Sequence, residues 1–371
     1  MAVNQAAVKS SPAQKESSAV AVKWGGLFAG AVLLLLLTVL VAELDDWIGF
    51  TFKERDVAQN PLEYPLTAVV IGLIANGLLR VTNLYHHIKP AIRTELFLKV
   101  GLVILGARIS LDDLVTTGTG GLIQALIMVA SVFLFSWWLG GKLKLNPTLR
   151  AVMASAVSIC GVSAAIAAAG SVLARKEEVT YVTALVIIVA LPMMVLMPPI
   201  AHAIGLPDDV AGAWFGGNID TTAAVVGAGT IFSDEAQEVA AIVKLGQNVM
   251  IGFVAFALAL YFATVVEKNK EGAQKPSVSM IWQRFPKFVI GFVLVSILVS
   301  ANAFSPEIVK ELNSANKWVF ALAFVAIGLD FHVSSIKEMG WRPVGVFAGA
   351  TVFNTALALL VAWLIFGVLG F

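Results

Sequence analysis

Long apolar stretches, separated by short polar segments, fill the chain after residue 23. A helix needs roughly 17–25 apolar residues to cross a bilayer, and about eleven stretches reach that length. Because lipid offers no hydrogen-bond partners, these stretches must satisfy their backbone groups internally, as helices. The sequence therefore predicts an all-α polytopic membrane protein with about eleven transmembrane helices. The stretches are 24–42, 62–79, 94–110, 119–140, 149–174, 179–204, 208–231, 236–265, 287–303, 316–340 and 343–370.

The composition excludes several other classes of protein. Only 13% of the residues are charged and 58% are hydrophobic, whereas about 25% are charged in a soluble domain. A single cysteine, Cys160, excludes an internal disulfide and a cysteine-rich metal site. No His or Cys spacing typical of zinc is present, so we expect no metal and no cofactor. The net charge of +1 gives no reason to expect a nucleic-acid partner. We therefore expect the protein to be embedded in a lipid bilayer.

The charged segments predict an orientation. Residues 1–23 are rich in Ala, Ser and Lys and predict a disordered cytoplasmic tail, and 24–42 predicts an extra N-terminal transmembrane helix that is retained. Lys and Arg concentrate in 80–93, 141–150 and 266–287, which the positive-inside rule assigns to the cytoplasm, while 43–63 is acidic. The N-terminus is therefore predicted inside and the C-terminus outside.

The chain also shows a weak internal repeat. FLKVGLVILG aligns with IVKLGQNVMIG, and ICGVS aligns with AIGLD, so that 62–204 echoes 208–370. Two units of five helices must lie upside down relative to each other, which is the inverted-repeat plan of secondary transporters. Chance likeness between apolar helices is the alternative, and VILGARIS on VAIGLDFH is a rival alignment.

Two glycine motifs predict helix breaks that would build a substrate site. A break at Cys160 and Gly161 and another at Ile327 and Gly328 would aim the positive ends of half-helices at a cavity. The alternative is a small-residue packing face. The predicted substrate-binding residues are Ser158, Cys160, Gly161, Val162, Ser163, Ile327, Gly328, Asn76, Asn218 and Lys244. Lys244 and its counterpart Lys99 could instead snorkel to the headgroups.

The stretch GGNIDTTAAVVGAG predicts a site for a coupling ion. Asp220 lies in an apolar segment, where an ionised carboxylate is costly unless it is paired, hydrated or protonated. Thr221 and Thr222 add oxygen ligands suited to sodium, and Asp330 aligns with Ser163 in the other half. Asp220 could instead be only the N-cap of a half-helix.

The elements ILGARISL, SICGVSAAIAA, VVGAG, AAIVKL and AIGLDFHVSSIKEMGWRP resemble the sulfate exporter family of bacterial inner-membrane proteins, the YeiH-like group. The likeness covers roughly 62–370. That family is distantly similar to the bile-acid/sodium symporter and sodium/proton antiporter superfamily, which implies core and panel domains with two crossing discontinuous helices. Two positions depart from the family pattern. Asp220 and Thr221 stand where a His-acid pair is expected, and Gln247 stands where an arginine is expected.

We therefore predict a secondary transporter of a small anion, sulfate or a related oxyanion or organic acid, coupled to protons or sodium by alternating access. A cation/proton antiporter of the same fold is the main alternative. An intramembrane hydrolase with Ser163 as nucleophile is a second, but neither His202 nor His332 lies in a motif for its activating base. A homodimer is the assembly that we consider.

Overall fold

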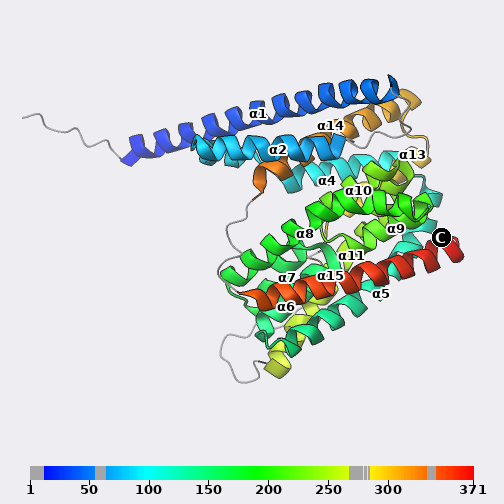
Figure 1. Ribbon diagram of the computed structural model, residues 1–371. Helices are drawn as coiled ribbons and strands as arrows, with labels where there is room; N and C mark the ends of the chain where they lie inside the picture. The colour runs from blue at the N-terminus through cyan, green and yellow to red at the C-terminus, as the bar shows by residue number, and fades with distance from the viewer. Residues whose placement is uncertain (1–11, 55–63, 267–278, 280–281, 283–284, 332–339) are drawn as a thin grey trace, which may run out of the picture. The chain divides into compact units, whose positions relative to one another are not determined.

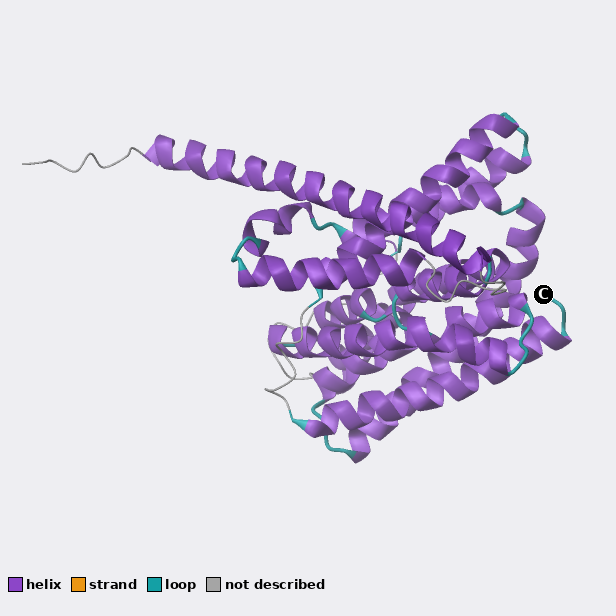
Figure 2. Cartoon of the chain, turned by 45° about the horizontal axis from the view of Figure 1, so that its top comes forward, coloured by secondary structure: helices purple, strands orange, loops and turns teal. Residues whose placement is uncertain are grey.

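The computed structural model describes residues 12–54, 64–266, 279, 282, 285–331 and 340–371. This part of the chain is helical and contains no strand, as Figure 2 shows. It divides into two compact units, with residues 1–97 and 321–331 in unit 1, and residues 98–320 and 332–371 in unit 2. Figure 1 labels the longer helices of both units.

Unit 1 contains α1 (Pro12–Glu54), α2 (Tyr64–Val81), α3 (Tyr85–Ile88), η1 (Lys89–Ala91) and one end each of α4 (Thr94–Leu105) and α14 (Pro306–Asp330). α1 packs against α2, α3 and η1. It begins at Pro12, so the latter half of the tail predicted to be disordered is helical, while residues 1–11 lie outside the described residues. Ala, Glu and Lys in this segment favour helix, which lets α1 extend beyond its apolar part.

The predicted break at Ile327 and Gly328 is wrong. α14 continues through both residues to Asp330. Gly328 is needed for close packing instead, because a Cβ there would collide with the carbonyl of Val69 and the Cα of Gly72 on α2. The sequence motif AIGLD therefore belongs to a helix–helix contact within unit 1, and its alignment with ICGVS does not identify a second broken helix.

Unit 2 holds the other helices. They are η2 (Gly106–Arg108), α5 (Leu111–Lys142), α6 (Pro147–Ser155), η3 (Ala156–Cys160), α7 (Val162–Val172), α8 (Lys176–Ala203), α9 (Asp208–Asn218), α10 (Thr222–Phe232), α11 (Asp234–Tyr261), η4 (Phe262–Val266), α13 (Phe288–Ser300), α15 (Trp341–Ala362) and η6 (Trp363–Val368), with the remainder of α4 and α14. Its core is formed by α11 against α5, α9 and α10, and by α15 against α5 and α9.

Seven described helices are long and apolar enough to cross a membrane. They support a multi-pass membrane protein, but they do not confirm the predicted eleven. Four of the predicted stretches fold instead into shorter helices: 94–110 into α4 and η2, 149–174 into α6, η3 and α7, 208–231 into α9 and α10, and 287–303 into α13.

The stretch 149–174 does not cross as one broken helix but turns back as a helical hairpin, here called hairpin A (147–172). Its two ends meet, since Asn146 before α6 donates from Nδ2 to Oε1 of Glu178 after α7 at 2.8 Å. α6 also packs against α7. α7 has 11 residues, which is about 16 Å of helix and roughly half of the apolar thickness of a bilayer.

The stretch 208–231 forms a second hairpin, here called hairpin B (208–232). The Ser233 hydroxyl after α10 hydrogen-bonds the carboxylate of Asp208 at the start of α9, and the two helices pack together. Arg175 immediately precedes α8, whereas Asp208 follows its last turn. The open ends of the two hairpins therefore lie at opposite ends of α8, and the hairpins point toward each other.

Candidate functional site

The tip of hairpin A is a turn that requires glycine. Gly161 has φ 64° and ψ −109°, a conformation that side chains rarely adopt. Its N–H donates to the carbonyl of Ala156 at 2.9 Å and closes the π-helical turn η3. A Cβ on Gly161 would also lie 2.5 Å from Cγ1 of Val186 on α8. The predicted break at Cys160 and Gly161 is confirmed, although it reverses the chain instead of kinking a spanning helix.

The tip of hairpin B is built from polar residues. α9 ends at Asn218, and Thr221 caps α10 by accepting from the N–H of Ala224 at 3.2 Å through its hydroxyl. The N-cap is therefore Thr221, and the alternative reading of Asp220 as the cap is wrong. Asp220 is left in the turn itself, only 2% exposed.

Lys244 on α11 joins the two tips. Its ammonium group donates to the carbonyl of Ile159 at 2.6 Å in hairpin A and to the carbonyl of Ile219 at 2.7 Å in hairpin B. Its third bond goes to Oε1 of Gln247 at 2.8 Å, so all three N–H donors are used. Both carbonyls end half-helices and carry the negative end of a helix dipole. The ammonium group of Lys244 therefore satisfies the terminal carbonyls of both half-helices at once.

α15 and α11 supply further polar residues that the sequence alone did not identify as site residues. Asn354 Nδ2 donates to the carbonyls of Asn218 at 2.9 Å and Val157 at 3.4 Å, again one in each hairpin. Gln247 Nε2 donates to the carbonyl of Gly217 at 3.1 Å. The sequence signal that could have identified them is a single amide side chain within an apolar run such as FNTALALL. Gln247, which stands where the family resemblance predicts an arginine, thus stabilises the tip of hairpin B.

Four buried polar atoms at the junction of the tips have no hydrogen-bond partner among the described residues, and two of them, Oδ1 of Asn248 and Oδ1 of Asn354, belong to amides that bond through their nitrogens. The other two are Oδ2 of Asp220 and the hydroxyl of Ser158. Asp220 lies against hairpin A, since a Cβ on Gly161 would be 3.3 Å from the Asp220 carbonyl oxygen and 3.5 Å from its Cβ. Buried polar groups without partners are rare in proteins, which makes these atoms candidates for contact with water, an ion or a ligand.

The junction gathers most but not all of the predicted site residues. Ser158, Cys160, Asn218 and Lys244 are buried there, and Thr222 joins it through a bond of 3.3 Å from Asn248. Val162 begins α7, whereas Ser163 on the same turn is exposed.

The remaining predicted site residues belong to unit 1. Asn76 donates to the carbonyl of Phe331 at 2.7 Å, near Gly328 and half-buried Ile327. The hydroxyl of Tyr85 lies 3.3 Å from Oδ1 of Asp330. Burial, together with this carboxylate, raises the pKa of Tyr85 to about 12, so the phenol remains a donor to Asp330. The roles proposed for these residues stay predictions.

The described residues contain no cluster of three or more His, Cys, Asp or Glu side chains that could hold a metal ion. The acceptors at the junction are carbonyl, hydroxyl and amide oxygens with one carboxylate.

Comparison with known proteins places the chain among membrane proteins. A family model described as "Conserved hypothetical protein 698" matches residues 30–347. A UPF0324 membrane protein of Rhodopirellula baltica is 37% identical over 92% of this chain and 64% of its own length. One from Nitratidesulfovibrio vulgaris is 33% identical over 79% of this chain and 81% of its own. The chain belongs to the UPF0324 family of membrane proteins.

A second Nitratidesulfovibrio vulgaris relative is 36% identical over 81% of this chain and 54% of its own length. The chain thus spans less than two thirds of the first curated relatives that it matches. No solved structure matches it.

Proposed function

We propose that this UPF0324 protein is a secondary transporter of a small anion, sulfate or a related oxyanion or organic acid, coupled to protons or sodium. The observation that carries the proposal is the tip-to-tip junction of hairpins A and B around Lys244 and Asp220. Irregular backbone at membrane depth is tolerated only where protein buries it or where it lines a cavity. Broken helices of this kind form substrate and ion sites near the midplane of transporters.

The start of α7 supports the binding of an anion. α7 follows Gly161, which offers no side chain to cap it, so the first N–H groups of the helix lack intrahelical partners. These donors and the positive end of the helix dipole favour an oxyanion. The partnerless hydroxyl of Ser158 can add a hydrogen bond to the same ligand.

Asp220 supplies a reason for coupling. An anion bound at the start of α7 would lie near a buried carboxylate, and two negative charges repel strongly in a medium of low polarity. A proton or a sodium ion on Asp220 would remove that repulsion. The anion and the cation would then bind together, which is what a coupled transporter requires.

The charge distribution supports an inner-membrane location with the open end of hairpin A in the cytoplasm. The open end of hairpin A carries Lys144, Arg175 and Lys176, and that of hairpin B carries Asp208 and Asp209. The positive-inside rule assigns the first end to the cytoplasm.

A cation/proton antiporter is the second candidate. All three Lys244 donors are already taken by protein acceptors, and Oδ2 of Asp220, which has no partner among the described residues, is an acceptor. This arrangement also suits exchange of a sodium ion for a proton with no anion.

Transport by proteoliposomes containing the full chain separates the two candidates. We expect sulfate or a competing oxyanion to move in a manner that depends on pH or on sodium, and Asp220→Asn to stop transport or flatten that dependence. Asp209→Asn, at the open end of the same hairpin, is the matched control and should behave as wild type. Sodium–proton exchange without any anion would favour the antiporter. An unchanged pH and sodium profile in Asp220→Asn would remove the coupling role.

A further inference from the structure

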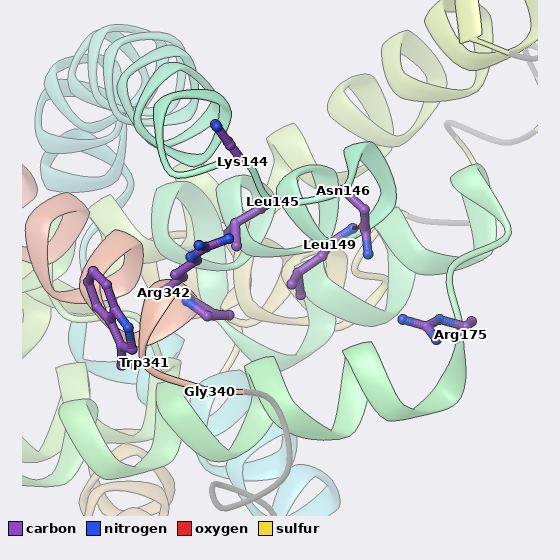
Figure 3. A pocket seen from close by; sticks show the side chains of 9 residues that line it. Lys144, Leu145, Asn146, Leu149, Arg175, Gly340, Trp341 and Arg342 are labelled. Carbon is purple, nitrogen blue, oxygen red and sulfur yellow. Dashed lines mark hydrogen bonds between the residues drawn. The ribbon is translucent and has the colours of Figure 1, made fainter.

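A pocket of about 510 Å³ opens where hairpin A begins and ends, away from the junction of the tips. Four segments line it: the turn after α5, the first turn of α6, the residue before α8 and the start of α15. Figure 3 shows Arg342 and Arg175 on either side of Leu149, with Lys144 farther out on the turn after α5.

The pocket has more positive than negative charge. Lys144, Arg175 and Arg342 line it, and the side chains of Lys144 and Arg342 are exposed and make no hydrogen bond or ion pair within the described part of the chain. The neighbouring carboxylate is Glu178, which is fully buried and lies 3.3 Å from the guanidinium of Arg175.

Glu178 is itself satisfied by protein donors. It accepts from Asn146 at 2.8 Å, from Thr148 at 3.0 Å and from the Arg175 N–H at 3.1 Å. Its charge therefore offsets Arg175, while Lys144 and Arg342 remain available to an external anion.

The start of α15 adds to this attraction. Gly340 precedes the helix and provides no side-chain cap. α15 has 22 residues, so its positive dipole end is fully developed at the pocket.

The walls are partly apolar. Leu149 forms part of the lining, and Trp341 at the rim is 71% exposed. Exposed tryptophan at a helix end is typical of the membrane–water interface. Basic pockets between helices at the cytoplasmic interface bind the phosphate headgroups of anionic lipids.

We propose that this pocket binds a phosphate-bearing anion through Arg342, Lys144 and Arg175. The phosphate can belong to the headgroup of an anionic lipid or to free phosphate from the cytoplasm. The site is independent of the transport site, since it lies at the open end of hairpin A and involves other residues.

The test uses the full chain in neutral detergent, with binding followed by native mass spectrometry and melting temperature. Phosphatidylglycerol is the lipid probe, phosphatidylcholine the lipid without net charge, and inorganic phosphate the soluble probe. We expect Arg342→Gln to weaken binding roughly five- to tenfold, since removing one cation near an anionic headgroup lowers the affinity by about this factor. Lys144→Asn, which also suits the φ of 58° at this position, should act likewise. Lys142→Gln, an exposed cation outside the pocket, is the matched control.

Binding of phosphatidylglycerol alone would identify the lipid, and binding of inorganic phosphate would identify a soluble ligand. Either result supports the proposal if the pocket variants weaken it and Lys142→Gln does not. The proposal is overturned if neither probe binds, if the two lipids bind equally, or if the pocket variants match wild type or the control.

Discussion

Hairpin A turns at Gly161, where φ is 64°, whereas hairpin B turns through Ile219 and Thr221, whose backbone is extended. The first tip, 158–163, has no charged side chain and contributes mainly backbone groups. The second contributes an amide, a carboxylate and a hydroxyl from Asn218, Asp220 and Thr221. This difference underlies the division of roles that we propose, in which one hairpin offers N–H donors to an anion and the other offers oxygens to a cation.

The hairpins should be easiest to distinguish by the side of the membrane from which they enter. In a Cys160→Ser background, single cysteines replacing Lys142 and Lys176 flank hairpin A, and cysteines replacing Ile204 and Glu235 flank hairpin B. An impermeant thiol reagent on intact cells should label both members of the second pair and neither of the first. Different labelling within either pair would mean that the segment crosses the membrane and does not return.

The turn of hairpin A should be intolerant of any side chain. Gly161→Ala should destabilise the detergent-solubilised protein by about 1–3 kcal/mol, because the backbone conformation is strained for alanine and Val186 occupies the space. Denaturation followed by the loss of helical structure measures this change in the free energy of unfolding.

Gly118→Ala on α5 is the matched control. The nearest atom to its Cβ would be 3.9 Å away, so alanine should be neutral or slightly stabilising in the helix. Equal stability of Gly161→Ala and wild type would show that the tip relaxes easily.

A smaller effect should distinguish the hydroxyls of the two tips. Thr221→Ala removes a helix cap and should cost about 1 kcal/mol, while Thr221→Ser should retain most of the stability. Ser158→Ala in hairpin A should be nearly neutral, because its hydroxyl has no partner among the described residues. Comparison of the three melting curves is the measurement. A larger loss of stability from Ser158→Ala than from Thr221→Ala would contradict this prediction.

The sequence was sufficient for part of the site. Gly161 between hydroxyl residues predicted a break, and Asp220 in an apolar stretch predicted a buried acid, because each is unfavourable in a plain membrane helix. The two apolar segments were also long enough for spanning helices, so their length alone did not reveal the hairpins.

The pairing of the breaks could not be read from the sequence. AIGLD resembles ICGVS, but Gly328 packs against α2 while Gly161 adopts a positive φ. A glycine can serve either purpose, and the surrounding helices decide which. The sequence also did not identify Asn354 and Gln247 as site residues, because a single amide in an apolar run is informative only when its hydrogen-bond partners are known.

By itself, the sequence determined the all-helical, membrane-embedded class and the presence of irregular positions near Gly161 and Asp220, since hydrophobic length and helix-breaking residues are local properties. The tertiary structure alone decided that both segments turn back and that their tips meet on Lys244. Those outcomes depend on which carbonyls remain without partners and which donor reaches them, and Lys244 reaches Ile159 and Ile219 from 85 and 25 residues away in the chain.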